Sequence, residues 1–151
     1  MTLNIVPYLT FNGNCREAME FYQHCLGGTL YFQTIGNSPG PVGKLPSKMK
    51  DYIVHASLHK EEVILTGTDL VSDAGLYPGN AVSLMLNCNS KQEITRLFDT
   101  LSKGGKVKHP LELNYSGALF GGFEDKFGHL WILNFDKREK GTPGYYFTGN
   151  N

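Results

Sequence analysis

The chain has 151 residues, of which 40% are hydrophobic and 19% are charged, and its 14 acidic side chains balance its 14 basic ones. This composition is typical of a globular protein with a buried core, and it excludes an intrinsically disordered chain. Because there is no excess of basic residues and no apolar run near the ~20 residues that span a bilayer, we expect neither a nucleic-acid partner nor a membrane segment.

The chain begins with a predicted strand, helix and second strand. Residues 5–11 suit a strand, and Asn14 and Glu17 then have the spacing of a helix capping box. Apolar side chains follow at helical spacing: Ala18, Phe21, Tyr22, Cys25 and Leu26. Gly27 is expected to end this helix, because glycine adopts a left-handed backbone at little cost. Residues 29–35 are rich in β-branched and aromatic side chains and predict the second strand.

A long irregular segment and a hairpin complete the first half. Residues 36–50 contain three prolines and three glycines, so we expect a loop, and a loop of this length is often functional. Residues 51–58 and 62–68 predict a hairpin that turns at 59–61. The polar residues 69–80 are expected to link the two halves.

The second half repeats this layout. Ser90 and Glu93 form the second capping box, and Gly104 and Gly105 end the second apolar helical stripe of Ile94, Leu97, Phe98 and Leu101. Four segments predict strands: 81–88, 106–109, 117–123 and 129–135. Residues 110–116 are expected to form a link between the second and third of these strands.

The repeat predicts an α+β fold of two tandem βαβββ modules in one domain. The caps lie 76 residues apart (14 to 90) and the glycine pairs 77 apart (27 to 104). The modules span residues 5–68 and 81–136, and residues 137–151 form a C-terminal tail. The tail contains Tyr145, Tyr146 and Phe147, which we expect to dock on a partner subunit or to fold over the binding cleft.

Several motifs resemble those of one known superfamily. Residues 7–18 (PYLTFNGNCREA), Phe21-Tyr22 and Leu26-Gly-Gly resemble the opening of the glyoxalase/bleomycin-resistance proteins, the vicinal oxygen chelate superfamily. His55-Ala-Ser-Leu, Thr66-Gly-Thr-Asp69 and residues 122–131 (GFEDKFGHLW) resemble its PhnB-like branch. Many members of that branch carry the name 3-demethylubiquinone methyltransferase. The resemblance extends over residues 5–136.

The resemblance implies paired modules, usually in a homodimer, that form a curved mixed sheet around a cup-shaped cavity. Metal-using members hold the ion with four His, Glu or Gln side chains, one on the first and one on the last strand of each half. The matching positions here are Pro7 or Tyr8, Leu65, Val82 and Ile132. Since none of these is an ordinary ligand, we expect no family-type metal site and no cofactor.

Five residues are candidates for the ligand cavity: Tyr8, His55, Leu65, Tyr115 and Trp131. His55 lies mid-strand, where it either contacts a polar ligand and shuttles a proton or is a satisfied histidine inside a sheet. Trp131 is either a wall for stacking or a core residue. Tyr115 lies near a position where relatives often carry Trp. The other histidines are expected to be structural or solvated: His24, His59, His109 and His129.

Motifs of other reaction classes are absent from the sequence. There is no Gly-x-Ser-x-Gly turn for a serine nucleophile, and the glycines of residues 117–122 lack the Gly-Lys-Ser/Thr ending of a phosphate loop. No Gly-x-Gly-x-x-Gly lies between a strand and a helix. This absence argues against the methyltransferase activity that the branch is often named for.

The first residues and the cysteines predict a cytoplasmic location. Residues 1–7 lack the charged start and long apolar stretch of a signal peptide. If Cys15 and Cys25 share one helix they lie about 15 Å apart, too far for a disulfide. With Cys88, they form no Cys-x-x-Cys motif, and we expect buried thiols in a reducing compartment.

Two functions remain open at this point. The first is a cytoplasmic, homodimeric binding or resistance-type protein that holds a small polar or aromatic molecule in its cavity without a metal centre. The alternative is a metal-independent or atypical enzyme, of lyase or isomerase type, in which His55 acts as acid and base. A purely structural protein is less expected, because the implied fold encloses a cavity.

Overall fold

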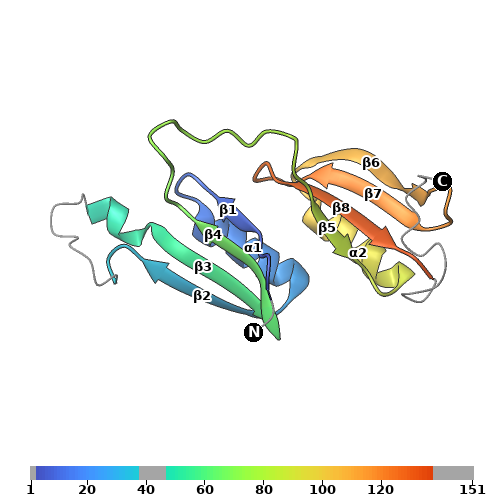
Figure 1. The fold of residues 1–151 in the computed structure, drawn as a ribbon, viewed down its shortest axis with the longest axis horizontal. Coiled ribbons are helices and arrows are strands. Elements are labelled where there is room, and N and C mark those ends of the chain that lie inside the picture. Colours follow the sequence, from blue (N-terminus) through green and yellow to red (C-terminus); the bar gives the residue numbers. More distant parts are fainter. Residues whose placement is uncertain (1–2, 38–46, 138–151) are drawn as a thin grey trace. The chain divides into compact units, whose positions relative to one another are not determined.

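The chain forms two compact units, Met1–Tyr77 and Pro78–Asn151, in a computed structural model that describes residues 3–37 and 47–137. The first unit contains β1 (Tyr8–Thr10), α1 (Cys15–Leu26), β2 (Thr29–Thr34), the 3₁₀ helix η1 (Ser47–Asp51), β3 (Ile53–Lys60) and β4 (Glu62–Thr68) (Figure 1). The second contains β5 (Leu84–Asn87), α2 (Lys91–Leu101), β6 (Lys106–Leu113), β7 (Leu119–Glu124) and β8 (Leu130–Phe135). The aromatic side chains predicted to dock from the tail lie outside the described residues.

Both units have the same topology. The strand order is β1-β4-β3-β2 in the first sheet and β5-β8-β7-β6 in the second. In each, the first strand runs parallel to the last, and the other neighbours are antiparallel. The predicted α+β fold of two βαβββ modules is therefore confirmed.

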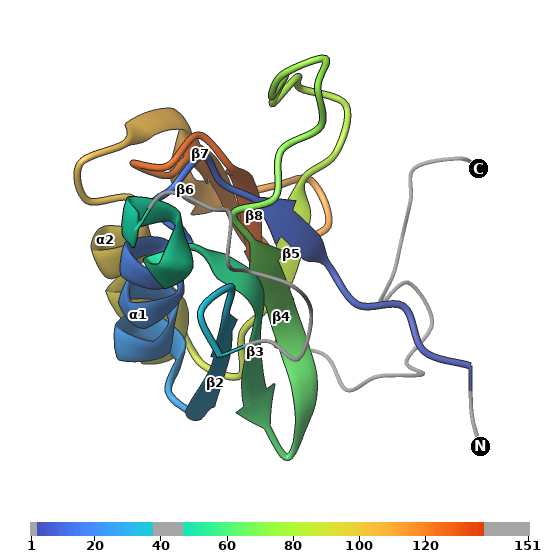
Figure 2. The ribbon, with the colours of Figure 1, turned by 90° about the vertical axis from the view of Figure 1, so that its left-hand side faces the viewer.

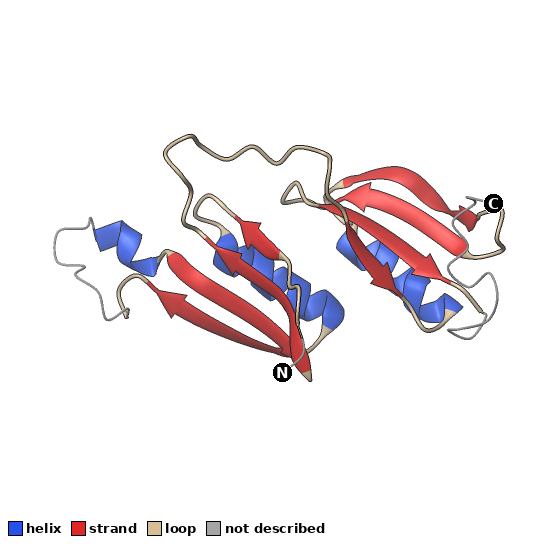
Figure 3. Cartoon of the chain, viewed as in Figure 1, coloured by secondary structure: helices blue, strands red, loops and turns tan. Residues whose placement is uncertain are grey.

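One helix covers one face of each sheet (Figures 2 and 3). The buried side of α1 consists of Cys15, Ala18, Met19, Tyr22 and Cys25, and that of α2 of Ile94, Leu97, Phe98 and Leu101. In the second unit Phe98 meets Phe123 edge-on, with ring centroids 5.1 Å apart, and Phe123 stacks on Trp131. Within the described residues, no helix is long and apolar enough to cross a membrane.

The start of α1 is capped by a residue distant in sequence. The carboxylate of Asp69 accepts hydrogen bonds through Oδ1 from the backbone N–H groups of Gly13 and Cys15, both at 2.9 Å. Its Oδ2 accepts a third, at 2.8 Å, from the N–H of Ile53 at the start of β3. Asp69 is only 4% exposed, so these bonds replace the water that the charge loses on burial.

The predicted capping box at Asn14 is therefore wrong. The side chain of Asn14 makes no capping hydrogen bond, and its backbone (φ −112°, ψ 24°) does not have the extended conformation that capping side chains use. The second predicted box is confirmed, because Ser90 Oγ accepts from the N–H of Glu93 at 3.0 Å. The Glu93 carboxylate reaches back to the N–H of Asn89, at 2.8 Å.

Close contacts with a neighbouring backbone explain why a glycine pair follows each of the two helices. Gly28 has φ +99°, and a Cβ there would lie 2.5 Å from the carbonyl oxygen of His59. In the second unit, a Cβ on Gly105 would overlap the carbonyl oxygen of Glu124. At both places the chain leaving the helix passes directly against the end of the third strand of its module, where only glycine fits.

Two segments differ from the predicted loops. Residues 47–50, expected to be irregular, belong to η1. Strand β6 continues through Pro110 to Leu113, whereas residues 110–116 were predicted to be a link. Proline is tolerated because β6 is an edge strand with register shifts on both sides of His109, so the missing N–H interrupts no internal ladder.

Replacing the Asp69 carboxylate by an amide tests its structural role. We expect Asp69→Asn to lower the free energy of unfolding by about 2–4 kcal/mol, because an amide has a single acceptor oxygen and no charge for three N–H donors. Urea denaturation followed by circular dichroism measures the change. The control is Asp73→Asn at an exposed position, which should leave stability within about 0.5 kcal/mol. Equal stability of the two variants would contradict this role.

Candidate functional site

The face of each sheet opposite its helix is the candidate functional surface. Alternate residues of a strand point to opposite faces. In β1 and β4, Leu9 and Leu65 are buried on the side of α1. Tyr8 and Thr66, next to them in the sequence, therefore point to the other face, which we call the open face. Tyr8 is 57% exposed there.

Four hydroxyl side chains form one row across the open face of the first unit. Tyr8 pairs with Thr66 in the sheet register, Thr66 with Ser57, and Ser57 with Tyr31. Directly paired residues share a face, with Cβ atoms about 5 Å apart. Thr66 Oγ1 donates to the carbonyl oxygen of Pro7 at 2.8 Å. The row therefore runs through all four strands, in the order β1, β4, β3 and β2.

Two histidines flank this row. His55 and His59 lie two residues before and after Ser57 on β3, and so on the same face. The His55 ring stacks near that of Tyr8, with centroids 6.3 Å apart. The His59 ring meets Tyr31 edge-on at 5.0 Å, and its Nε2 lies 2.9 Å from Ser57 Oγ in a hydrogen bond. The row and its histidines thus form a polar surface suited to a hydrogen-bonding ligand.

Two of the five predicted cavity residues lie together within one unit. Tyr8 and His55 are neighbours on the open face, where His55 is exposed. Leu65 is 3% exposed and pairs with the buried Leu58 on the helix-covered face. Trp131 is also 3% exposed, on the helix-covered face of the other unit. Tyr115 lies fully exposed in the turn between β6 and β7.

Trp131 is held by a buried carboxylate. Its indole N–H donates to Asp125 Oδ2 at 2.8 Å, while Asp125 Oδ1 accepts from the backbone N–H groups of Phe127 and His129 at 2.9 and 3.0 Å. Asp125 is 2% exposed. Burial lowers the pKa of His129, although the nearby Asp125 acts in the opposite direction. These residues organise the turn between β7 and β8 rather than a ligand site.

The open face of the second unit also consists of transverse rows. One row runs Asn87–Asn134–Phe120–Glu112 through the four strands. Asn134 Nδ2 donates to Asn87 Oδ1 at 3.2 Å, which joins the edge residue of this row on β5 to its neighbour on β8. The row therefore changes from paired amides at one edge, through an aromatic ring, to a carboxylate at the other edge.

The neighbouring row is mostly apolar. It runs Met85–Ile132–Gly122–His109. Gly122 has no side chain, and a Cβ built there would lie 3.9 Å from His109 Cδ2. The surface beside the Phe120 ring is consequently open on the side of His109.

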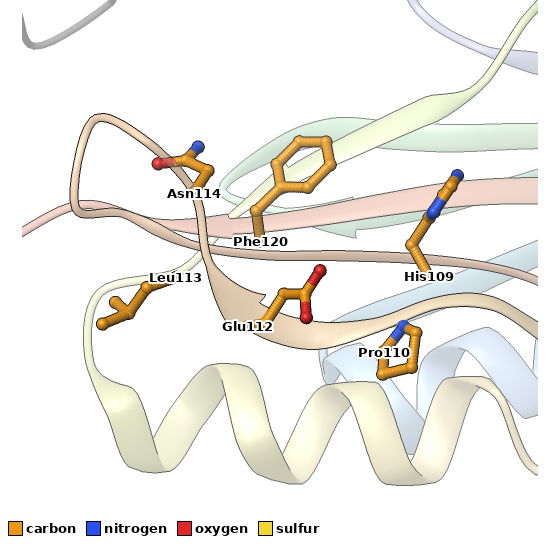
Figure 4. Close-up of a pocket in the computed structure, with 6 residues that line it drawn as sticks. All are labelled: His109, Pro110, Glu112, Leu113, Asn114 and Phe120. Atoms are coloured by element: carbon orange, nitrogen blue, oxygen red, sulfur yellow. The ribbon is translucent and has the colours of Figure 1, made fainter.

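A pocket of about 200 Å³ lies where these rows meet β6. It is lined by His109, Pro110, Glu112, Leu113, Asn114 and Phe120. In Figure 4, the side chains of His109, Asn114 and Phe120 point away from the helix below the sheet. The pocket therefore opens on the uncovered side.

Asn114 is oriented by its own turn. Its Oδ1 accepts hydrogen bonds from Ser116 N (3.0 Å), Ser116 Oγ (2.7 Å) and Ala118 N (3.1 Å). Because three donors converge on this atom, it must be the oxygen of the side-chain amide and not the nitrogen. The amide nitrogen is the end nearer Phe120 (Figure 4), so Asn114 presents a hydrogen-bond donor to the pocket.

Most of the pocket residues were missed by the sequence analysis. His109 was expected to be structural or solvated, and Glu112, Leu113 and Asn114 fell in a predicted link. Because Pro110 reads as a strand breaker, the alternation of side chains beyond it was not recognised. Proline is tolerated in an edge strand, so Pro110 was compatible with a strand that continues to Leu113.

A family profile described as 3-demethylubiquinone-9 3-methyltransferase matches residues 3–134. The chain belongs to this family. Protein YjdN of Escherichia coli (strain K12) is 30% identical to it over 145 residues, which cover 88% of this chain and 95% of YjdN. The crystal structure of protein PA1353 from Pseudomonas aeruginosa is similar with a TM-score of 0.76 and 43% identity, and the match covers 89% of this chain and 98% of that one.

Solved structures from the wider glyoxalase/bleomycin-resistance superfamily share the fold. A glyoxalase-related enzyme from Fulvimarina pelagi has the same fold, with a TM-score of 0.56, 21% identity and 89% coverage of each chain. Other solved structures of the glyoxalase/bleomycin resistance/dioxygenase superfamily are similar in the same way. The predicted membership of the family named for 3-demethylubiquinone methyltransferases therefore holds. At this level of identity, the likeness to the glyoxalase/bleomycin-resistance structures shows the fold alone.

The residues at the superfamily's metal positions do not fit a divalent ion. On the open faces, the paired first-strand and last-strand positions are Tyr8 with Thr66 and Met85 with Ile132. Val82, the position expected from the sequence, precedes β5. None of the four carries an imidazole or carboxylate. Within residues 3–37 and 47–137, no three His, Cys, Asp or Glu side chains gather as a metal site.

The first strand–helix turn is not available to an anionic cofactor group either. The N–H groups of Gly13 and Cys15, which would face a phosphate at the start of α1, are bound by the Asp69 carboxylate. Neither sheet is the doubly wound parallel sheet of a Rossmann methyltransferase. The family description names a methyltransferase, but these residues do not form a site for a methyl donor of that type.

The cysteines are poor nucleophiles. Burial raises the pKa of Cys15 to about 12, with a further rise from Asp69 that Arg16 opposes. Burial likewise raises the pKa of Cys88 to about 11, where Glu93 adds to the rise and Arg96 opposes it. All three cysteines, including Cys25, are buried, and none of them forms a disulfide. Thiolate chemistry is therefore not available near neutral pH.

This predicts slow thiol modification of the folded protein. At pH 8 roughly one Cys15 in ten thousand is a thiolate, so Ellman's reagent should react over hours rather than seconds. The rate should rise with pH as the thiolate fraction increases. Guanidinium-unfolded protein is the control, in which all three thiols should react at once. A thiol that reacts within seconds in the folded protein would contradict the burial described here.

Proposed function

We propose that the protein binds a small polar or aromatic molecule on the open faces of its sheets, as a binding or resistance-type member of its superfamily. The observation that carries this proposal is the pocket of about 200 Å³ on the open face of the second unit. It combines an aromatic ring, Phe120, with the polar groups of His109, Glu112 and Asn114. A concave site in which polar groups converge beside an aromatic ring is a typical feature of ligand sites.

The proposal includes binding without the superfamily's metal centre. Its support is the residue chemistry of the open faces, where the expected ligand positions hold Tyr8, Thr66, Met85 and Ile132. A ligand would instead meet hydroxyl, imidazole and amide groups, which recognise polar atoms by hydrogen bonds.

A second candidate function is a metal-independent enzyme of lyase or isomerase type with His55 as acid and base. Two observations favour it. The Tyr8 ring lies against His55, and Ser57 is hydrogen bonded to His59 in the same row. Such pairs can move a proton to or from a bound ligand. Binding is preferred because the positions at which metal-using members hold their ion carry Tyr8, Thr66, Met85 and Ile132 instead of ligating side chains.

We also propose that the protein is a cytoplasmic homodimer. The support for a dimer is that each sheet keeps one face free of its own helix, with exposed apolar or aromatic side chains such as Tyr8 and Tyr31 on the first unit and Met85 on the second. A second copy could enclose part of this surface. The support for the cytoplasm is the set of three buried thiols, none of which forms a disulfide.

Ligand screening tests the binding proposal. Phosphonates, aromatic antibiotics and glutathione thioesters should be tested by thermal shift. A true ligand at about 100 times its Kd should raise Tm by about 5 °C or more. If no class raises Tm, binding of this kind is contradicted.

Substitution of His55 separates the two candidate functions. Because His55 is exposed, we expect His55→Gln to keep the fold. It should weaken a ligand held on the open face of the first unit by about 3–10-fold, as measured by calorimetry. His24→Gln, exposed at the end of α1, is the control. If the protein is an enzyme, His55→Gln should abolish turnover of that ligand without changing its affinity. If it is a binding protein, neither the unmodified chain nor the variant turns the ligand over.

The oligomeric state is measured directly. Light scattering coupled to size exclusion should give twice the chain mass of 16.8 kDa. A mass of one chain at micromolar concentration would refute the dimer.

A further inference from the structure

We propose that the pocket of the second unit binds a small organic cation, an ammonium group that sits on the Phe120 ring beside the Glu112 carboxylate. This inference rests on the proposed binding function and names the ligand class of one of its sites. The ligand also carries a hydrogen-bond acceptor, which meets the amide of Asn114. Neither the ligand class nor the site is implied by the metal positions of the superfamily.

The first argument is the geometry of Phe120 and Glu112. They are register partners on β7 and β6, so their side chains leave the same face about 5 Å apart at Cβ. A cation between them contacts the negative face of an aromatic ring and a carboxylate at once. This combination is how proteins recognise alkylammonium groups.

The second argument is the charge around the pocket. Glu112 is the one carboxylate in the lining, and the lining has neither lysine nor arginine. No salt bridge or hydrogen bond joins Glu112 to another residue within 3–37 or 47–137. Among the register-paired residues of this face, the other acidic one is Glu124, which lies opposite Lys106, so its charge is locally balanced. A cation is therefore attracted to the Glu112 end of the face.

His109 is the other titratable group that faces the pocket. It lies on the far side of Phe120 from Asn114 (Figure 4), and it pairs with Gly122 in the register. Since Gly122 has no side chain, the ring of Phe120 remains accessible on that side. Pro110 and Leu113 add apolar contacts for the alkyl groups of the cation.

The third argument is the hydrogen-bond donor of Asn114, which lies on the opposite side of the Phe120 ring from His109 (Figure 4). Asn114 Oδ1 is occupied by three donors of its turn, so the amide nitrogen is the group directed to the pocket. It can donate to a hydroxyl or carbonyl oxygen of the ligand. The pocket thus matches an ammonium ion with an oxygen a few bonds away, and its volume of about 200 Å³ limits the ligand to a small molecule.

Choline and its uncharged isostere 3,3-dimethylbutan-1-ol provide the test, because they share shape and hydroxyl group but differ in charge. Titration calorimetry on the full chain should detect choline and show at least about 10-fold weaker binding of the isostere. Equal affinity of the two probes would overturn the inference.

Three variants locate the site. Glu112→Gln removes the charge at constant size, and Phe120→Leu removes the ring, so each should weaken choline by about 3–30-fold. Glu124→Gln is the matched control on the same face and should bind choline as the unmodified chain does. Circular dichroism and Tm establish that each variant is folded. Unchanged choline binding in Glu112→Gln would overturn the inference.

The failure of this inference is distinguishable from that of the proposed function. If choline does not bind but an uncharged or anionic compound from the ligand screen does, the cation site is wrong and small-molecule binding stands. If no compound of either kind binds, both are wrong.

Discussion

The buried carboxylate of Asp69 is the interaction on which the first unit depends. Its two oxygens join the turn after β1, the first residue of α1 and the first residue of β3. A charge this deeply buried is stable only when its hydrogen bonds are complete, so the three segments must meet in one arrangement. Because β3 begins at this carboxylate, the positions of His55, Ser57 and His59 on the open face follow from it.

The second unit uses the same principle at a different place. Asp125 binds two backbone N–H groups of its turn and the indole of Trp131, and so aligns β7 with β8. Both carboxylates belong to the stretches that carry the family resemblance, residues 66–69 and 122–131. Those motifs therefore hold the fold together, while the pocket side chains on β6 lie outside them. This explains how a family can be recognised from residues that say little about the ligand.

The sequence predicted the fold well because its signals are local: two helical stripes, two glycine pairs and alternating strands. It failed where a distant residue decides a local structure, as when Asp69 replaces Asn14 at the helix cap. The site was predicted only in part. Tyr8 and His55 do lie together on the open face. However, a shift of one residue separates Leu65 in the core from Thr66 on the open face, and strand periodicity alone does not resolve that shift.

Pro110 has a consequence beyond the pocket that it lines. Strand β6 is the outer edge of its sheet, and an unpaired edge is where another polypeptide can add by backbone hydrogen bonding. Proline removes a donor from this edge, and the register shifts around His109 bend it. The irregularity beside the pocket therefore also protects the folded protein from aggregation through strand addition.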